Sequence, residues 1–381
     1  MHIAFLTPEY PYEKIGNSGG IGTSIKNLAE ALVKQQVQVS IFIYGQKKTE
    51  TFSEGEITFY LIENKNYTIG KGWFYRKYVQ NFVNKICIQN KIELIEAPDW
   101  TGFTAFIKFK VPLVLRLHGS DTYFCELENR PQKLKNKLLE TIAIKQANAL
   151  VAPSKFTAHK TAELFNLNKK AIKVIPNGVN TTQFNNTSNN KYTPYTLLYF
   201  GTLIRKKGVL HLPAILNEVR KKVPQAQLIL IGNDSYDVVT NSKSTWELIK
   251  KQSTLKNEKQ ITYLGKIPYS QIQSYIANAH VCIFPSLAET FGMVTAEAMA
   301  MGKIVVSSNF GWASELIVDN ESGLLADPTN HKVFAAKITE AVLNVSLAQT
   351  MGVKARTQVE KNFDIDLIAK KNINFYNSLI K

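Results

Sequence analysis

The sequence predicts an α/β fold in which parallel sheets are flanked by helices and the chain is divided into about two domains. A strand, a loop, a helix and a second strand follow one another over residues 281–307, which is the order of one βαβ unit. Candidate strands alternate with helical stretches along the rest of the chain. With 381 residues, the chain also exceeds what a single hydrophobic core normally organises.

In the first half of the chain, short apolar runs rich in β-branched residues mark the strands. Residues 2–7 form the first, and a helix follows from Ile21, where apolar residues repeat at helical spacing. Between them lies the glycine-rich turn 16–22, whose bare backbone could approach a phosphate at the start of the helix. The further strand candidates are residues 39–44, 57–62, 92–96, 113–117, 149–151 and 172–175.

A change of composition marks the domain boundary. Six asparagines fall between Asn177 and Asn190, with little apolar content among them, which is typical of a solvated connector. We therefore assign residues 1–185 to a first domain and residues 186–362 to a second.

The second domain opens with strand 196–200 and a turn that carries Arg205, Lys206 and Lys207. Three adjacent cations after a strand can clamp a diphosphate, although cations at such a turn can also be simply solvated. Strands 228–231 and 261–264 follow.

The most informative stretch is residues 281–328. A buried strand over 281–284 ends in a loop that carries Glu289, and the next helix carries Glu297. Open α/β sheets bind ligands beyond the carboxyl ends of their strands. Residues 291–294 would supply unpaired first-turn amides that suit a phosphate, while nearby carboxylates suit sugar or ribose hydroxyls. On spacing alone, both glutamates could equally be solvated acids near a helix start.

This stretch resembles a known family. Glu289 and Glu297 lie within Pro-Ser-x-x-Glu-Thr-Phe-Gly and Glu-Ala-Met-Ala-x-Gly-Lys, and the similarity continues through residues 311–315 to residues 323–325. These motifs resemble the retaining nucleotide-sugar glycosyltransferases of family 4. The resemblance implies the GT-B fold, two Rossmann-like domains that face each other across a cleft, with a last helix over 363–381 that returns to the first domain.

In the second domain, the resemblance assigns each motif residue a role toward the donor. It implies that Glu297 binds the ribose and that Glu289, a catalytic residue, holds sugar hydroxyls. The donor-binding residues would include Phe291, Gly292, Met293 and Val294 through their amides, and Ile267 in a loop that holds the nucleobase.

The phosphate-binding turn departs from the family pattern. Lys207 and Gly208 match its Lys-Gly, but the family arginine is Thr202 here, so either Arg205 or Lys206 is expected to reach the same phosphate. In the first domain, Gly19 and Gly20 occupy the place of the family's Gly-Gly loop. His118, just past strand 113–117, matches the place of a histidine that lines the sugar pocket, although a lone histidine there can also be a packing residue.

Composition limits the class of protein and its partners. The net charge of +16 is spread over both halves, and no nucleic-acid motif accompanies it, so we expect an anionic substrate or membrane surface and no nucleic acid. Residues 71–78 interleave aromatics with cations, which is typical of a peripheral contact with an anionic membrane but also compatible with a buried stripe. Three scattered cysteines favour a reducing cytoplasm, and the peripheral contact would place the protein at the inner face of the membrane. Neither the cysteines nor Asp364 and Asp366 predict a metal site.

The expected function is transfer of a hexose from a nucleotide-sugar donor to a sugar or lipid-linked acceptor, in cell-surface polysaccharide or glycolipid biosynthesis. No cofactor or metal is expected. Two alternatives remain, a non-hydrolysing sugar-nucleotide epimerase of the same fold and a catalytically inactive protein that binds nucleotide sugars. The sequence does not identify the base, the sugar or the linkage.

Overall fold

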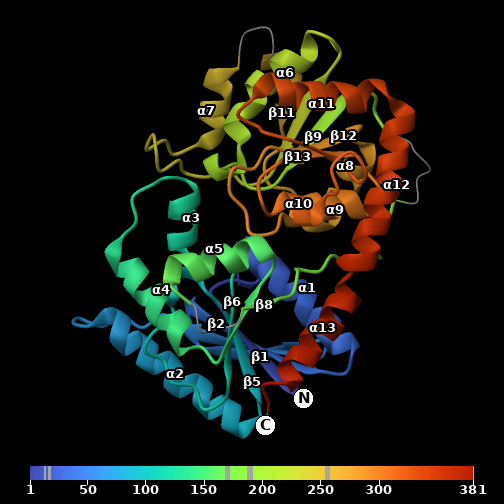
Figure 1. The fold of residues 1–381 in the computed structure, drawn as a ribbon. Coiled ribbons are helices and arrows are strands. Elements are labelled where there is room, and N and C mark those ends of the chain that lie inside the picture. Colours follow the sequence, from blue (N-terminus) through green and yellow to red (C-terminus); the bar gives the residue numbers. More distant parts are fainter. Residues whose placement is uncertain (13, 16–18, 168–171, 187–191, 254–257, 381) are drawn as a thin grey trace. The chain divides into compact units, whose positions relative to one another are not determined.

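The computed structural model of this chain describes residues 1–12, 14–15, 19–167, 172–186, 192–253 and 258–380. These residues form two compact units (Figure 1). The first contains Met1–Gly178 together with Ile365–Lys381, and the second contains Val179–Asp364. Each unit has one sheet, and each sheet has helices on its faces, so the predicted α/β architecture is confirmed.

The sheet of the first unit has the strand order β3-β4-β2-β1-β5-β6-β7-β8. All neighbours pair in parallel except β3, an edge strand that pairs antiparallel with β4 and that the sequence analysis did not predict. The strands are β1 (His2–Thr7), β2 (Gln38–Gln46), β3 (Glu50–Glu54), β4 (Ile57–Glu63), β5 (Leu94–Pro98), β6 (Leu113–Arg116), β7 (Ala149–Ala152) and β8 (Ile172–Val174).

Helices cover both faces of this sheet (Figure 1). They are α1 (Gly20–Lys34), α2 (Lys71–Gln89), α3 (Asp121–Leu127), α4 (Leu134–Gln146), α5 (Lys155–Phe165) and α13 (Ile365–Asn377), with a short 3-10 turn η1 (Trp100–Gly102). Successive side chains of a strand point to opposite faces, so Ile3 and Phe5 of β1 pack with α1 and α13. Ala4 and Leu6 pack with α2 and α4 on the other face. Because both faces are covered, the central strands are mostly apolar, and the buried charges of Glu96 in β5 and Arg116 in β6 are exceptions.

The second unit has an all-parallel sheet with the order β11-β10-β9-β12-β13-β14. The strands are β9 (Thr196–Phe200), β10 (Gln227–Ile231), β11 (Ile261–Tyr263), β12 (Val281–Phe284), β13 (Val305–Ser308) and β14 (Leu324–Ala326). The helices are α6 (Leu212–Arg220), α7 (Thr245–Gln252), α8 (Ile272–Asn278), α9 (Met293–Ala300), α10 (Ala313–Leu316), α11 (His331–Leu343) and α12 (Val345–Asn362). Short 3-10 turns are η2 (Arg205–Lys207), η3 (Val209–His211), η4 (Glu258–Gln260) and η5 (Tyr269–Gln271).

The division between the units lies at Gly178 and Val179, whereas the sequence analysis placed it between residues 185 and 186. The asparagine-rich composition hid two core residues of the second unit, because Val179 and Phe184 are fully buried in its hydrophobic cluster. Residues 187–191 of the predicted connector lie outside the described residues. The chain passes from the second unit back to the first between Asp364 and Ile365. Next to this point, the Val179 amide donates to the carbonyl of Phe363 over 2.8 Å.

Helix α13 is tied to the first unit by a buried polar network. The Arg116 guanidinium donates to both carboxylate oxygens of Glu96, over 2.6 and 3.0 Å, and to the side-chain oxygen of Asn372 in α13 over 2.6 Å. The Tyr376 hydroxyl of α13 donates to Glu96 over 2.7 Å. All four side chains are buried, so removing the charge of Glu96 or of Arg116 would leave the other charge buried without its partner.

Candidate functional site

The loop between β12 and α9 delivers the site of the second unit to the carboxyl end of its sheet. Gly292 is the N-cap of α9 with a φ of 91°, a left-handed conformation that favours glycine. Phe291 is buried and anchors the loop, while Met293 and Val294, which open the helix, are half-buried. The amides of Thr295 and Ala296 donate to the carbonyl of Gly292, over 3.0 and 3.2 Å, so the helix donors that α9 can offer a ligand are the amides of Met293 and Val294, at the positive end of its dipole.

Lys207 and Glu289 form an ion pair in this loop region. The hydroxyl of Ser286 donates to the same Glu289 oxygen over 3.2 Å. The backbone holds the two loops together, because the carbonyl of Lys206 accepts the amides of Leu287 and Ala288 over 2.8 and 3.1 Å. Lys207 and Glu289 are therefore presented by adjoining loops at the ends of β9 and β12.

The close approach of these loops requires Gly208. This residue has a φ of +67°, and a Cβ built on it would lie 1.7 Å from the carbonyl oxygen of Pro285. Any side chain would therefore push the Lys207 loop away from the Glu289 loop. Glycine after Lys207 is thus explained by the close packing of the two loops, in addition to the charge that Lys207 supplies.

Glu297 is buried within α9, and the Tyr269 hydroxyl donates to its carboxylate over 2.6 Å. Burial raises the pKa of Glu297 to about 7, while the Tyr269 hydrogen bond and the charge of Lys207 act in the opposite direction. Glu297 thus changes its protonation state near neutral pH. Tyr269 is itself positioned by an edge-on ring contact with Phe184 at 5.6 Å.

Arg205 forms a bidentate ion pair with Asp237. Its Nε and Nη2 donate to the two carboxylate oxygens over 2.8 Å each. Asp237 is buried and also accepts the amide and hydroxyl of Thr240, so these donors lower its pKa to about 2, with the Arg205 hydrogen bond the largest cause. Arg205 is therefore held in a fixed orientation beside the Lys207 turn.

Thr202 and Ile267, two further positions that the sequence analysis discussed, lie in loops of the second unit. The carbonyl of Thr202, where the resembling family has arginine, accepts the Tyr199 hydroxyl over 2.9 Å. Ile267 is half-buried in the loop between β11 and η5. In the same loop, the carbonyl of Gly265 accepts the Gly232 amide over 2.9 Å. The assignment of Ile267 to a nucleobase loop remains a prediction.

In the first unit, a carboxylate occupies the start of α1. One oxygen of Glu9 accepts the amides of Gly19 and Gly22, over 3.0 and 2.9 Å. Gly19 is the N-cap of α1, and both Gly19 and Gly20 are exposed. Residues 16–18 of the glycine-rich turn lie outside the described residues. A phosphate approaching this helix start would meet Glu9, so the role of Gly19 and Gly20 stays a prediction.

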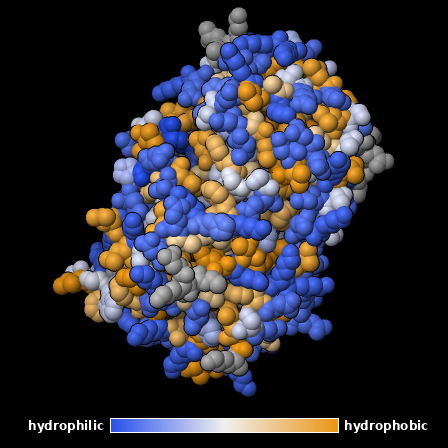
Figure 2. Space-filling model, in the orientation of Figure 1, coloured by the Kyte–Doolittle hydropathy of each residue, from blue (hydrophilic) through white to orange (hydrophobic). Residues whose placement is uncertain are grey.

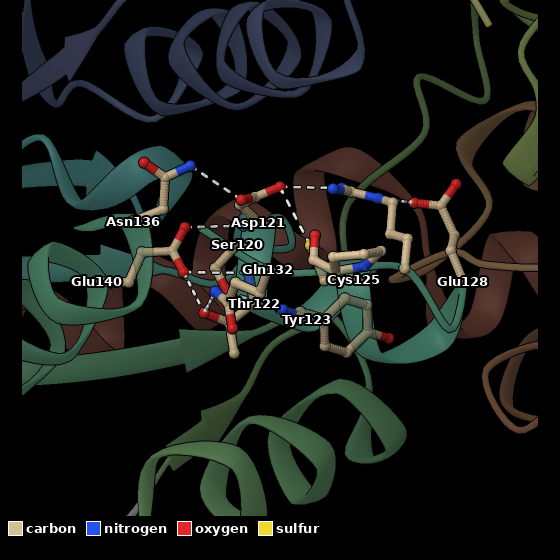
Figure 3. A network of polar contacts seen from close by, with 11 residues as sticks. Ser120, Asp121, Thr122, Tyr123, Cys125, Glu128, Gln132, Asn136 and Glu140 are labelled. Atoms are coloured by element: carbon tan, nitrogen blue, oxygen red, sulfur yellow. Dashed lines mark hydrogen bonds and ion pairs between the residues drawn. The ribbon is translucent and has the colours of Figure 1, made fainter. Parts of the chain in front are cut away.

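His118 lies in the loop after β6, and buried carboxylates accept backbone amides of this loop and of the start of α3 that follows it. The His118 amide donates to Asp99 over 2.9 Å. The carboxylate of Glu140 in α4 accepts the amides of Asp121 and Thr122 over 2.8 and 3.1 Å (Figure 3). Burial raises the pKa of Asp99 to about 8 and also raises the pKa of Glu140.

The imidazole of His118 is neutral at physiological pH, because burial and the nearby Arg116 charge lower its pKa to about 3. Within the part of the chain that the structure describes, this ring makes no hydrogen bond to a protein atom. It can therefore donate from one nitrogen and accept at the other toward a ligand.

The structure thus brings Lys207, Glu289 and the start of α9 together at one sheet edge, and the Lys207 charge also acts on Glu297. Sequence reasoning missed the side chains that position the candidate residues. They are Tyr269, Asp237 and Ser286 in the second unit and Glu9, Asp99 and Glu140 in the first. Two signals were available. Tyr269 follows the Ile267–Pro268 loop, and Asp99 follows a strand end, where polar residues commonly serve a site.

The described residues contain no group of three or more histidine, cysteine, aspartate or glutamate side chains that could hold a metal ion. Asp366 lies in the first turn of α13, and Asp364 accepts a hydrogen bond from the Thr181 hydroxyl. The helices of the described residues include none that is both long and apolar enough to cross a membrane.

Comparisons with known proteins agree over nearly the whole chain. A family described as Glycosyltransferase Family 4 matches residues 18–183, and one described as Glycosyl transferases group 1 matches residues 180–358. An uncharacterized glycosyltransferase of Methanocaldococcus jannaschii is 23% identical over 394 aligned positions, covering 99% of this chain and 98% of the relative.

Solved structures show the same fold. Sucrose-phosphate synthase from Thermosynechococcus elongatus superimposes with a TM-score of 0.81 at 20% identity, covering 99% of this chain and 98% of that one. The Anabaena protein HepE in complex with UDP-glucose superimposes with a TM-score of 0.74 at 20% identity, covering 100% of both chains.

Proposed function

Because this chain belongs to the glycosyl transferases group 1, with the GT-B fold, we propose that it moves a hexose from a nucleotide-sugar donor to a sugar or lipid-linked acceptor with retained anomeric configuration. We place the reaction in the cytoplasm, in the assembly of cell-surface polysaccharide or glycolipid. The observation that carries the proposal is the convergence of Lys207, Glu289, Glu297 and the start of α9. The complex of HepE with UDP-glucose supports a nucleotide-sugar donor.

The site offers a partner for each part of such a donor. A diphosphate needs fixed positive charge, which Lys207 and the first-turn amides of α9 supply. Arg205, oriented by Asp237, is our replacement for the family arginine at Thr202. Glu297 would accept the ribose hydroxyls, and Glu289 the hydroxyls of the sugar.

Binding would exchange one set of partners for another. Without a donor, Lys207 and Glu289 neutralise each other. A donor would bring phosphate oxygens to Lys207 and sugar hydroxyls to Glu289. Both side chains would therefore exchange their ion pair for new polar partners, and neither would be left partly buried without one. The leaving diphosphate, stabilised in this way, would take the proton of the acceptor hydroxyl as the new glycosidic bond forms on the same face of the sugar. We assign His118, carried by the first unit, to contact with the sugar.

The test is a panel of nucleotide sugars with different bases and sugars, screened first for thermal stabilisation. A donor at 100 times its Kd should stabilise the protein by about 2.7 kcal/mol. Glu289→Gln should reduce the response to the sugar-bearing donor, whereas Glu321→Gln, an exposed glutamate of the same unit, should not.

The stabilising donor is then incubated with candidate acceptors, and the product is examined by NMR for its anomeric configuration. Transfer with retention supports the proposal. Conversion of the donor sugar without any acceptor would identify an epimerase instead. Donor binding with neither reaction across sugar and lipid-linked acceptors would identify a binding protein.

A further inference from the structure

One surface of the first unit is not explained by donor binding. It consists of the outward sides of α2 and α4 and of the loop 103–110, and we call it the α2–α4 face. Both helices pack on the same face of the sheet, in one hydrophobic cluster with residues such as Leu6 and Leu115 (Figure 1). Their inner residues, including Val79, Val83 and Ala143, are buried there. The outer side of this helix layer is surface.

Large apolar side chains are exposed on the α2–α4 face. Leu134 is 84% exposed and Leu138 60%, one turn apart on α4. At the start of α2, Trp73 and Phe74 are each about half exposed, and the Trp73 ring lies 5.5 Å from the ring of the exposed Phe106. Figure 2 shows hydrophobic residues breaking the hydrophilic surface along this side of the first unit. The aromatic run predicted from the sequence is therefore exposed at Trp73 and Phe74, and the buried stripe of α2 begins only at Val79.

The same face carries charge of a single sign. Helix α2 contains no aspartate or glutamate, and the loop 103–110 contains none either. The one acid of α4, Glu140, is buried and accepts backbone amides. The exposed cations of these three segments are Lys71, Lys85, Lys108, Lys110, Lys135, Lys137 and Lys145.

Arg76, which the sequence analysis counted among the membrane-facing cations, has a different role. Its Nε donates to the carbonyl of Phe103 over 2.9 Å, and its Nη1 donates to the carbonyl of Gly72 over 3.0 Å. It is half-buried and fixes the loop 103–110 against α2. Lys77, also half-buried, lies over the Trp73 ring, with its Nζ 5.1 Å from the centroid.

We propose that the α2–α4 face docks the first unit onto an anionic lipid surface, with Trp73, Phe74 and Leu134 entering the interface. Lysines without acidic neighbours match anionic headgroups, and exposed aromatic and leucine side chains gain from the boundary with the acyl chains. A nucleic acid would use the lysines but would leave the leucines of α4 in water. The proposal is independent of the donor site, because it concerns a different surface of the fold.

The first experiment is co-sedimentation with vesicles of phosphatidylcholine alone or mixed with phosphatidylglycerol. The wild type should bind the anionic vesicles at low salt, bind them less at high salt, and bind neutral vesicles weakly. The variant Lys135→Glu with Lys137→Glu should bind about tenfold or more weakly, because each lysine near an anionic surface contributes several-fold to affinity. The matched control is Lys370→Glu with Lys371→Glu on α13, which makes the same charge change on the opposite face of the sheet.

A second pair of variants separates insertion from simple charge attraction. Trp73→Ser with Phe74→Ser should weaken binding without changing the net charge, while Val238→Ser with Val239→Ser, two exposed valines of the second unit, should not. Brominated lipids should quench the wild-type tryptophan fluorescence, and this quenching should be lost in Trp73→Phe. All of these side chains are exposed apart from Trp73 and Phe74, which are half exposed, so unfolding curves should match the wild type.

Three outcomes would overturn the proposal. The first is a wild type that ignores anionic vesicles at low salt. The second is an equal loss of binding in the α13 control, which would trace binding to the total charge rather than to this face. The third is binding to double-stranded DNA as tight as to vesicles with no quenching by brominated lipid, which would make the face a polyanion site.

Discussion

The pKa of Glu297 leads to a prediction in which stability and donor binding change in opposite directions. The carboxylate is buried, and burial raises its pKa from 4.5 to about 7. Between these two pH values the folded protein holds a proton that the unfolded chain has lost. The stability of the ligand-free protein should therefore fall as pH rises from 4.5 to 7 and level off above 7.

The size of both effects follows from this shift. A difference of about 2.5 pKa units corresponds to about 3 kcal/mol at most, so Glu297→Gln should stabilise the ligand-free protein at pH 8 by up to that amount. Ribose hydroxyls need the ionised carboxylate as acceptor. With a pKa of about 7, roughly one molecule in eleven is ionised at pH 6, so donor affinity should fall up to about tenfold between pH 8 and pH 6.

The assay is calorimetric titration with a nucleotide sugar across this pH range. Each phosphate of a nucleoside diphosphate sugar has one ester and one anhydride linkage, and its remaining acidic group does not titrate there. His118 does not either, because its pKa is about 3. Glu297→Gln should bind more weakly at pH 8, by about 1.5–3 kcal/mol, and should lose most of the pH dependence. Tyr269→Phe removes the hydrogen bond that favours the ionised form and should move the midpoint to higher pH.

Three results would refute this reasoning. One is a Glu297→Gln variant with wild-type affinity at pH 8, which would separate Glu297 from the nucleotide. Another is a pH dependence that survives in that variant, which would trace it to another group. The last is a Tyr269→Phe midpoint that moves to lower pH, which would contradict the direction assigned to the hydrogen bond.

The remaining predictions concern the phosphate turn, the α13 anchor and metal. Arg205→Ala should lower kcat/KM about 10–100-fold, and adding Thr202→Arg should recover part of this loss. Because an arginine at position 202 is not expected to replace the Asp237 ion pair, such a recovery in enzyme assays would isolate the phosphate role. If no activity is recovered, residue 202 is not the equivalent position. Glu96→Gln should cost about 3–5 kcal/mol in urea unfolding because it leaves the Arg116 charge buried without its partner; a cost as small as that of exposed Glu56→Gln would contradict this. Transferase activity should persist in EDTA, and a loss that Mg²⁺ or Mn²⁺ restores would show that a metal is required.

Much of the fold, and the placement of the candidate site residues in loops and at a helix start, was predictable because the evidence is local in the sequence. A fully buried strand such as residues 281–284 is a continuous apolar run, and its bounds agree with the structure. Helix α9 was predictable because residues 296–301 are a run of strong helix formers that ends at Gly302, although the structure begins the helix at Met293, with Gly292 as its N-cap, rather than at Phe291. Lys207 and Glu289 lie in loops after two such strands, and parallel strands deliver their ends to one sheet edge.

The groups that hold the site were not predictable, because their pairings join distant positions. Arg205 pairs with Asp237 across 32 residues and Tyr269 pairs with Glu297 across 28, and neither spacing has a periodic signature. The exposure of individual apolar side chains could not be predicted from the sequence either. Trp73 and Val79 are both apolar residues of one helix, and only the packing of α2 against the sheet shows that the first is exposed and the second buried.

Under the proposed function, the Lys207–Glu289 ion pair should make the site favour an intact donor over its fragments. A nucleoside diphosphate attracts Lys207 but leaves Glu289, whose side chain is only 12% exposed, without its cation. A free sugar gives hydroxyls to Glu289 but provides no anion for Lys207. Only a ligand that joins a diphosphate to a sugar replaces both partners at once, so each half of the donor removes the penalty that the other half would incur. Gly208 keeps the two loops close enough for this exchange, because a side chain at this position would meet the carbonyl of Pro285.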